Sequence, residues 1–253
     1  MGHFFIKGNI METGLIVDVE TTGLDPSKDK IIEFACIKFA IIPETFDLKI
    51  LSTYSSLEDP GIAVSAEITK ITGLDNAILH NQKVDWNIVR TALEEASIVV
   101  AHNAEFDRGF IENRVELAEI KKHWACSLKH IRWKKHGFNS RALNYLAADH
   151  GFINPFAHRA LFDCATTFRL IQNYFAELHE LSFQPEMIFF ATNATFSKKD
   201  LLRDADYRWN NEQRVWSKRV FQCDSEQEKT FLREKIYDGY SQHTEKFLTL
   251  GHD

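Results

Sequence analysis

Three short segments of the sequence together contain four acidic residues and one histidine whose chemistry could be combined. Asp18 and Glu20 open the first segment, Asp107 closes the second, and His158 and Asp163 bound the third. Four carboxylates can hold two divalent cations, and a histidine beside them can take a proton from water, which together hydrolyse a phosphodiester bond. Each segment lies at the end of a predicted element, so the three can converge. The pattern predicts a two-metal phosphodiester hydrolase.

Asp18 and Glu20 lie in a run that has the composition of a buried strand. Residues i and i+2 of a strand project from the same face, and Ile16 and Val19 indicate that residues 14–20 are buried. Two neighbouring carboxylates repel each other unless a cation lies between them. A solvent-exposed strand edge is the alternative, but it fits this apolar run poorly. We therefore expect both residues to be metal ligands.

The turn after this strand predicts contacts to the substrate. Its backbone N–H groups can bind a terminal sugar hydroxyl or a phosphate. The residues expected there are Thr21, Thr22, Gly23 and Leu24. The side chain of Leu24 either wedges against a base or packs in the core, and the sequence leaves both open.

The second segment follows the apolar run 98–101. Asp107 falls in the first turn of the helix predicted after it, where capping is the alternative to metal binding. Its place beside a strand end favours a metal ligand. His102 and Asn103 are expected to contact the substrate, with helix capping as the alternative for Asn103. Phe106 either stacks on a base or packs in the core.

His158 and Asp163 are five residues apart, which on one straight helix separates them by about 140°. We therefore expect His158 on the loop before a helix and Asp163 inside it, and Pro155 favours a break there. A histidine on such a loop can deprotonate the attacking water. An ordinary surface histidine is the alternative.

The elements that must position these residues form a mixed sheet flanked by helices. The predicted strands are residues 14–20, 31–42, 48–54 and 98–101, and the predicted helices are residues 84–95, 105–117, 140–149 (from a Ser140 cap) and 157–180. The first three strands are expected to form an antiparallel meander, and strand 98–101 to pair in parallel. This domain is expected to cover residues 1–182.

A small α+β module is expected over residues 183–253. It contains a predicted strand 187–191, a helix 197–205, a hairpin 207–221 and a final helix 225–237. Between Ala191 and Cys223, Lys and Arg outnumber Asp and Glu by seven to four, and aromatic residues interleave with them. Either this hairpin holds a single strand or its aromatics form the module's own core. Substrate guidance and docking to a partner protein stay open.

The overall composition is that of a soluble, cytoplasmic protein. The chain has 253 residues, 44% hydrophobic and 26% charged. A net charge of -6 argues against coating nucleic acid through bulk charge, but not against holding a strand end at a metal site. The four widely spaced cysteines are expected to be reduced, without a zinc site. Neither a signal peptide nor a membrane span is expected.

These segments resemble the DEDDh family of 3′–5′ exonucleases, which includes the epsilon proofreading subunit of bacterial DNA polymerase III, RNase T and oligoribonuclease. The resemblance runs from about Thr13 to Ile171 and is carried by residues 18–25, 100–107 and 158–163, with residues 69–73 similar to the family's helical stretch. Arg159 stands where the tyrosine branch has Tyr, so the histidine branch fits better. Cys126-Ser127 departs from the Asp-Thr of many relatives but touches no expected ligand.

The resemblance implies an RNase H-like mixed five-stranded sheet. It implies two Mg²⁺ or Mn²⁺ ions held by Asp18, Glu20, Asp107 and Asp163, and His158 as the general base. The implied reaction releases nucleoside 5′-monophosphates from a 3′ end.

We expect an epsilon-like exonuclease of DNA replication or repair, acting on single-stranded DNA or frayed 3′ ends. Trimming of RNA ends or oligoribonucleotides is an alternative. A second alternative is an inactive nucleic-acid-binding or scaffold protein. This alternative is disfavoured because no expected metal ligand or general base is missing from the sequence. A polymerase or another protein partner is compatible with the pattern, and the sequence leaves the oligomeric state open.

Overall fold

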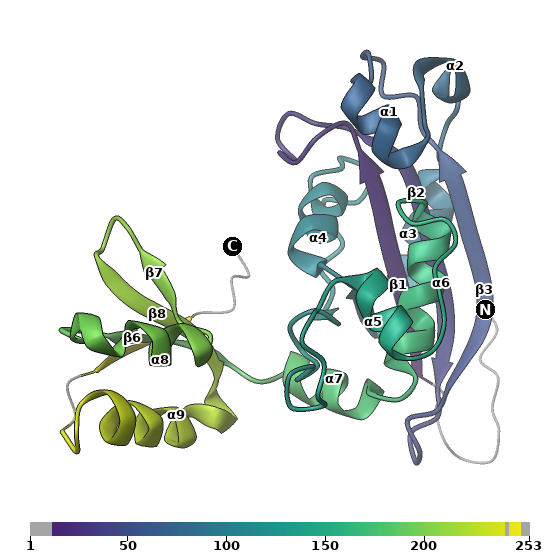
Figure 1. The fold of residues 1–253 in the computed structure, drawn as a ribbon. Coiled ribbons are helices and arrows are strands. Elements are labelled where there is room, and N and C mark those ends of the chain that lie inside the picture. Colours follow the sequence, from purple (N-terminus) through teal and green to yellow (C-terminus); the bar gives the residue numbers. More distant parts are fainter. Residues whose placement is uncertain (1–11, 241–242, 249–253) are drawn as a thin grey trace. The chain divides into compact units, whose positions relative to one another are not determined.

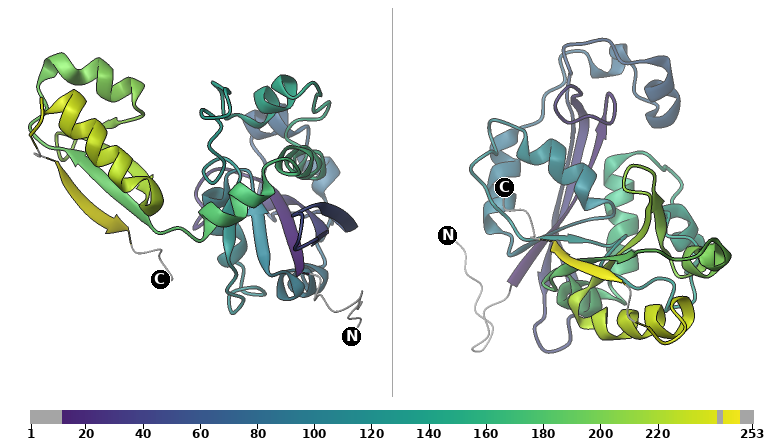
Figure 2. Two further views of the ribbon diagram at one scale, coloured as in Figure 1. Left: turned by 90° about the horizontal axis from the view of Figure 1, so that it is seen from below. Right: turned by 90° about the vertical axis from the view of Figure 1, so that its left-hand side faces the viewer.

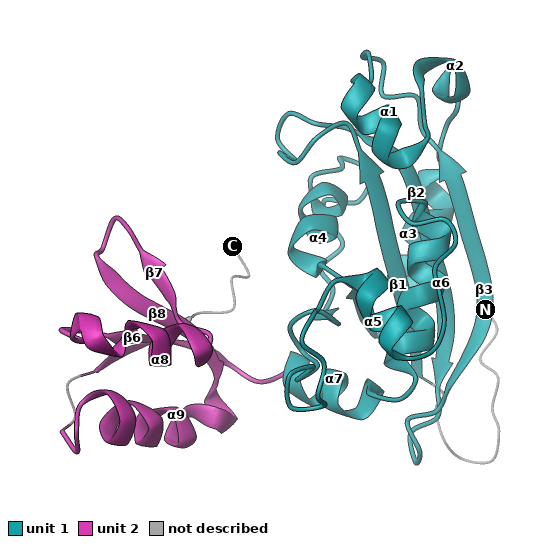
Figure 3. Ribbon diagram, in the orientation of Figure 1, with its two compact units in different colours: residues 1–182 teal, residues 183–253 magenta. Residues whose placement is uncertain are grey.

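The computed structural model describes residues 12–240 and 243–248. The chain folds as two compact units, residues 1–182 and 183–253 (Figure 3). Each is described by itself. Among the described residues, no helix has the length and apolar character needed to cross a membrane.

The first unit is built on a mixed five-stranded sheet (Figure 1). Its strands are β1 (Glu12–Thr21), β2 (Ile31–Ile41), β3 (Leu48–Leu57), β4 (Ile98–Ala101) and β5 (Trp124–Cys126). Their order is β3-β2-β1-β4-β5. β1, β2 and β3 pair antiparallel, whereas β4 and β5 run parallel to β1. The predicted fold class, with its meander and parallel half, is confirmed.

Helices cover both faces of this sheet and so divide its core in two. They are α1 (Ala66–Thr72), α2 (Asn76–Leu79), α3 (Trp86–Glu95), α4 (Ala104–Glu112), α5 (Leu143–Asp149), α6 (Ala160–Ile171) and α7 (Phe175–Ser182). Val17 and Val19 of β1 pack toward α3 and α4, whereas Ile16 packs toward α6 and α7. Because side chains alternate along a strand, Asp18 and Glu20 share the α6 face with Ile16.

The single helix predicted over residues 157–180 is wrong. α6 begins at Ala160, because His158 has a left-handed backbone (φ 62°) that an α-helix cannot contain. The chain also turns between α6 and α7. That turn packs the ring of Tyr174 5.0 Å from Trp133 and lets its hydroxyl bond to His150.

Two other predicted helices are shorter than expected. α5 begins at Leu143 instead of Ser140, because the Ser140 hydroxyl accepts a bond from the backbone N–H of Ala142, before the helix starts. α4 ends at Glu112, and the chain then forms successive turns up to Leu117. The helical stretch predicted around residues 69–73 corresponds to α1, which ends at Thr72 and is capped by Gly73 in a left-handed conformation suited to glycine.

The second unit is a four-stranded antiparallel sheet with helices on one side (Figure 2). The strands are β6 (Glu186–Ala191), β7 (Arg208–Asn210), β8 (Val215–Phe221) and β9 (Thr244–Leu248), in the order β7-β8-β6-β9. Its helices are α8 (Lys199–Asp204) and α9 (Ser225–Phe231), with a short π-helical continuation, Leu232–Ile236. The sequence analysis did not predict β9.

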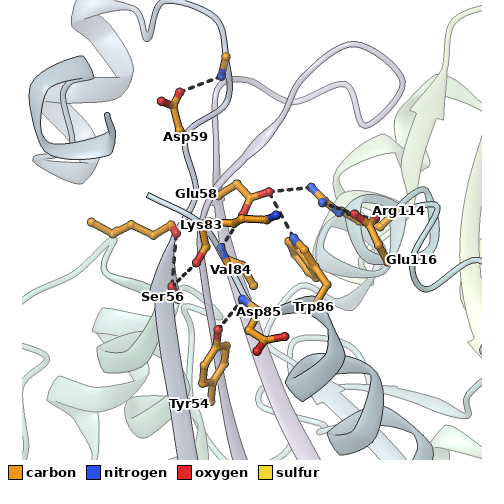
Figure 4. A network of polar contacts seen from close by, with 12 residues as sticks. Tyr54, Ser56, Glu58, Asp59, Lys83, Val84, Asp85, Trp86, Arg114 and Glu116 are labelled. Atoms are coloured by element: carbon orange, nitrogen blue, oxygen red, sulfur yellow. Dashed lines mark hydrogen bonds and ion pairs between the residues drawn. The ribbon is translucent and has the colours of Figure 1, made fainter. Parts of the chain in front are cut away.

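Glu58, a mostly buried residue directly after β3, ties α3 and the end of α4 to that strand (Figure 4). Glu58 accepts hydrogen bonds from the backbone N–H of Val84 at 2.6 Å and the indole of Trp86 at 3.2 Å. It also pairs with Arg114 at 3.4 Å, and that guanidinium lies 4.0 Å from the centre of the Trp86 ring. Arg114 follows α4, the helix that carries Asp107. The network therefore holds α3 and α4 in place, and α4 carries Asp107, one of the expected metal ligands.

Replacing Glu58 with alanine should destabilise the first unit by about 2 kcal/mol, because it leaves the N–H donors of Val84 and Trp86 without an acceptor and removes one of the two carboxylates that pair with Arg114. Urea unfolding followed by circular dichroism measures this change. Glu116→Ala removes a more exposed partner of the same arginine, at 3.0 Å, and should cost less than about 1 kcal/mol. Equal losses in the two variants would contradict the role given to Glu58.

Candidate active site

Three of the expected metal ligands meet in one place. Asp18, Glu20 and Asp163 each offer one carboxylate oxygen, and these oxygens all lie within 4.8 Å of one another. The first two come from the face of β1 that packs toward α6, and Asp163 lies in the first turn of α6. Residues far apart in the sequence are thus brought together by packing of one helix against one strand.

Asp107 reaches the same strand from its other edge. β4 pairs with β1 only at residues 14–16, so the later part of β1 has no neighbouring strand on that side. The carboxylate of Asp107 accepts a hydrogen bond there from the backbone N–H of Val19, at 3.1 Å. Val19 lies between the two ligands of β1. Asp107 therefore takes the place of a neighbouring strand at this edge of β1 and joins the acid cluster. The residue is only 3% exposed.

Asp163 is held by groups that the sequence analysis did not select. The side-chain amide of Asn154 donates to one carboxylate oxygen at 2.8 Å, and the backbone N–H of Arg159 donates to the other at 3.1 Å. These bonds fix the orientation of the carboxylate before any ligand arrives. No pattern in the sequence singled out Asn154.

An ion pair between a buried glutamate and a partly exposed arginine lies beside the cluster. Glu33 of β2 is 2% exposed and stands directly opposite Glu20 in the strand register. Its carboxylate accepts from the Arg159 guanidinium at 3.1 Å and from the backbone N–H of Ala160 at 3.2 Å. The sequence analysis missed this role, although an acid within the apolar run of β2 was visible. Arg159 thereby compensates a further buried negative charge next to the ligands.

Burial raises the pKa of all four carboxyl groups, and neighbouring carboxylates raise it further for Asp18, Glu20 and Asp107. Burial, followed by the charges of Asp107 and Asp163, holds the pKa of Asp18 well above its usual range. Burial and the same neighbours raise the pKa of Glu20 to about 8. Burial raises the pKa of Asp107 to about 7 and that of Asp163 to about 6, the latter opposed by His158. Without cations, the four groups cannot all be ionised at neutral pH.

This donor set fits hard divalent cations. All the ligand atoms are carboxylate oxygens, and neither a thiolate nor an imidazole belongs to the group. Mg²⁺ and Mn²⁺ prefer such oxygens, and Mg²⁺ needs only a few of them when water and phosphate complete its shell. Bound cations would also remove the repulsion that raises the pKa values.

His158 is exposed in the turn directly before α6, as the spacing argument required. No hydrogen bond within the described residues holds its imidazole, although its charge acts on Asp163. A left-handed backbone is strained for a residue with a side chain, by roughly 1–3 kcal/mol. Such strain at the entrance to an acid cluster is typical of functional residues.

The turn after β1 is closed by Asp29. The Thr22 side chain and the backbone N–H of Asp25 both donate to its carboxylate, at 3.1 and 2.9 Å. A Cβ at Gly23 would lie 2.5 Å from this carboxylate, so a side chain there would displace Asp29 from the turn. The backbone N–H of Thr22 is not free, because it donates to the Lys30 carbonyl at 2.9 Å.

The other side chains of this turn differ in their exposure. Thr21 is buried, and its hydroxyl donates to the Gly23 carbonyl at 2.5 Å. Leu24 is 83% exposed, so it lies outside the core and is available to a ligand. Substrate contacts by residues of this turn remain a prediction.

The residues of the second segment are more engaged with the protein than expected. Both ring nitrogens of His102 are bonded, Nε2 donating to the Arg141 carbonyl at 2.9 Å and Nδ1 accepting from the Ser127 hydroxyl at 2.8 Å. Burial lowers the pKa of His102 to about 4, so its ring is neutral. Asn103 is the N-cap of α4 without a side-chain capping bond, and Phe106 packs 5.0 Å from Phe110. Substrate contacts by these three also remain a prediction.

Residues 15–171 match the Exonuclease family RNase_T, a range that contains all four acids and His158. The chain belongs to this exonuclease family. The expected family and enzyme class, a 3′–5′ exonuclease, are thereby confirmed.

Individual relatives agree with this assignment. The DNA polymerase III subunit epsilon of Aquifex aeolicus is 30% identical over 181 residues, which cover 68% of this chain and 86% of that protein. The PolC-type DNA polymerase III of Listeria innocua is 32% identical over 69% of this chain, but the chain spans only 12% of that polymerase. The nuclease domain of 3′hExo, a DEDDh family member crystallised with rAMP, shares the fold at 15% identity and a TM-score of 0.52, over 66% of this chain and 93% of that domain.

Without metal, the first unit should lose stability as the pH rises from about 4.5 to 8. The raised pKa values mean that the folded state binds more protons than the unfolded state in this window, so each pH step favours unfolding. Thermal unfolding in EDTA measures the trend, and Mg²⁺ should reverse it, with the largest gain in melting temperature near pH 8.

Glu20→Gln should flatten the pH dependence measured in EDTA, because it removes one of the titrating groups. Glu67→Gln, a matched change at an exposed position of α1, should leave the dependence unchanged. If both variants follow the parent curve, the cluster does not control stability.

Proposed function

We propose that this chain is an active exonuclease that removes nucleoside 5′-monophosphates from the 3′ ends of single-stranded or frayed DNA. The observation that carries the proposal is the convergence of Asp18, Glu20 and Asp163 within 4.8 Å. Asp107 joins them through the backbone of the same strand. Buried acids at this density are unfavourable in a protein that has no cation to bind.

The four carboxylates are proposed to hold two Mg²⁺ or Mn²⁺ ions. When bound, such ions supply Lewis-acid stabilisation of the phosphate and of the leaving 3′-oxygen, and they ease ionisation of water. The protein's own part is to fix the ligands beforehand. Asn154 and the backbone of Arg159 orient Asp163, and the backbone of Val19 orients Asp107.

His158 is proposed to take the proton of the attacking water. Its imidazole is exposed at the turn before α6 and faces no competing hydrogen bond within the described residues. The backbone N–H of the next residue bonds to Asp163, so the base and a metal ligand share one short segment. A base positioned in this way typically contributes a factor of 10²–10⁴ to the rate.

The substrate class is inferred from the relatives. The epsilon subunit and the PolC polymerase are proteins of DNA synthesis, which favours DNA. RNA is the alternative, because the fold is shared by a nuclease crystallised with rAMP. Leu24, exposed at the turn after β1, is proposed to pack against the terminal base, with the other residues of that turn near the 3′ nucleotide.

A DNA polymerase is the proposed protein partner. The support is the sequence similarity, at 30% identity, to a polymerase III subunit over 86% of that subunit's length. An inactive scaffold is disfavoured, because all four acids and the histidine are present at the site.

The purified chain should shorten 5′-labelled single-stranded DNA from the 3′ end in Mg²⁺ or Mn²⁺, and not in EDTA. Asp163→Asn should lower the rate by more than about 100-fold, since even the loss of an outer partner of a metal ligand costs 10–100-fold. Circular dichroism should show that the variant is folded. A matched RNA oligomer tests the substrate: faster cleavage of RNA would overturn the DNA assignment, and undiminished activity of Asp163→Asn would overturn the site.

His158→Gln should lower kcat by about 10²–10⁴-fold while leaving Mg²⁺ binding intact. Calorimetric titration with Mg²⁺ separates the two effects, because a lost metal ligand would weaken binding and a lost base would not. The acidic limb of the pH–rate profile should also change in the variant. His80→Gln, at an exposed position beyond α2, is the control and should leave the rate unchanged.

A further inference from the structure

The second unit has one sheet face that its own helices do not cover. α8 and the helical stretch from α9 to Ile236 pack on the side of Met187, Phe189 and Ala191 (Figure 2). Because side chains alternate along β6, Ile188 and Phe190 project from the opposite side. Both are partly exposed, and neither belongs to the core cluster of this unit.

The strand register identifies the neighbours of these two residues. Phe190 stands between Ser217 of β8 and Thr244 of β9. Ile188 stands between Arg219 and Lys246 of the same two strands. Arg208 of β7 is paired with Ser217 and so lies on this face as well. We name this surface the open face, defined by Ile188, Phe190, Arg208, Ser217, Arg219, Thr244 and Lys246.

The open face is positively charged around an apolar centre. Its three cations, Arg208, Arg219 and Lys246, are all exposed. The register places Glu186 on the same side, 3.9 Å from Arg219. The Arg219 side chain nevertheless remains 58% exposed. In residues 183–253 as a whole, acidic and basic residues are in near balance. The positive charge is therefore concentrated on this side of the sheet.

The two tryptophans of the hairpin lie on the other side. Trp209 and Trp216 form a cross-strand pair with ring centres 5.7 Å apart, and Trp216 packs against the core. Lys218 also points to the helical side, where it pairs with Glu228 at 2.6 Å. The sequence analysis gave the aromatic residues of this hairpin two alternative roles. Trp216 packs against the core, and the aromatic residues that the register places on the uncovered side are Phe190 of β6 and Phe221 of β8.

We propose that the open face binds single-stranded DNA. An aromatic ring on a central strand can stack with a base, and cations on both sides of it can contact phosphates. Neighbouring strands are about 4.8 Å apart, so Arg219 and Lys246 lie about 10 Å apart with Ile188 between them. A second copy of the chain fits this surface poorly, because two copies would bring like charges together.

The inference deepens the proposed function, on which it rests for the class of ligand. A strand held by the second unit would remain attached while its 3′ end is shortened. The open face should therefore affect long substrates and leave hydrolysis of a single nucleotide ester unchanged.

The test measures binding of a labelled single-stranded DNA 20-mer to the full chain in EDTA, by fluorescence anisotropy, so that hydrolysis plays no part. Arg208→Gln with Arg219→Gln should weaken binding about tenfold and reduce the salt slope by about 1.4, the value for two lost phosphate contacts. The matched control, Arg203→Gln with Arg233→Gln, removes two exposed cations from the helical side and should change neither quantity. Equal losses in the two double variants would overturn the proposal.

Stacking is tested separately. Phe190→Leu keeps the apolar contact but removes the ring, and should weaken binding several-fold. The control, Phe196→Leu, alters an exposed ring in the turn before α8. An unchanged affinity of Phe190→Leu would overturn the stacking role, and tighter binding of an RNA 20-mer than of DNA would overturn the choice of ligand. A change of oligomeric state instead of affinity, seen by size-exclusion chromatography, would make the face a protein interface and also overturn the proposal.

Activity distinguishes this inference from the proposed function. With the p-nitrophenyl ester of thymidine 5′-monophosphate and Mg²⁺, the open-face variants should match the parent, whereas their KM for the DNA 20-mer should rise. If the parent does not hydrolyse the ester, the proposed function fails, but the binding result in EDTA still decides the open face.

Discussion

Mutual repulsion among buried carboxylates is the constraint on which the first unit depends. Asp18, Glu20, Asp107 and Asp163 lie too close together, in surroundings that are buried or largely buried, to be ionised at once without cations. A fold that assembles them must draw its stability from elsewhere. The surrounding sheet does so, because β1, β2 and β4 bury apolar side chains on both faces.

The positions of the four acids follow from how elements begin and end. Two lie on one face of β1, and the other two lie in the first turns of α4 and α6, where the helix dipole favours negative charge. The early end of β4 exposes the N–H group of Val19 to Asp107. A longer β4 would occupy that group and exclude the carboxylate. The short strand is therefore part of the site.

The strand that carries Asp18 and Glu20, and the grouping of these acids with Asp163, could be predicted from the sequence because both follow local rules. Alternation along β1 was enough to place Asp18 and Glu20 on one face, and the angle per residue was enough to separate His158 from the helix of Asp163. Contacts between distant segments could not be predicted in this way. Asn154 and Glu33 act through Asp163 and Arg159, and no spacing links them in the sequence.

Errors in the helix boundaries have a similar origin. The helix predicted over residues 157–180 is interrupted where Tyr174 packs against Trp133, a contact between residues far apart in the chain. β9 was missed because it is stabilised by pairing with β6. The sequence left open whether the hairpin holds a nucleic-acid strand or forms the core of its own unit. Only the strand register distinguishes these roles, because it places the two tryptophans on one face of the sheet and Arg208 and Arg219 on the other.

Arg159 differs in kind from the other groups that balance the acid cluster. Metal ions can dissociate and a histidine can lose its proton, but a guanidinium keeps its charge at any pH at which the protein is folded. Anchored to buried Glu33, it lowers the pKa of Glu20 against the effects of burial and of the carboxylates of Asp163, Glu33 and Asp107. It also holds the backbone that orients Asp163. Its ion pair with Glu33 therefore holds the turn of His158 and the start of α6 in place while the charge of the cluster changes.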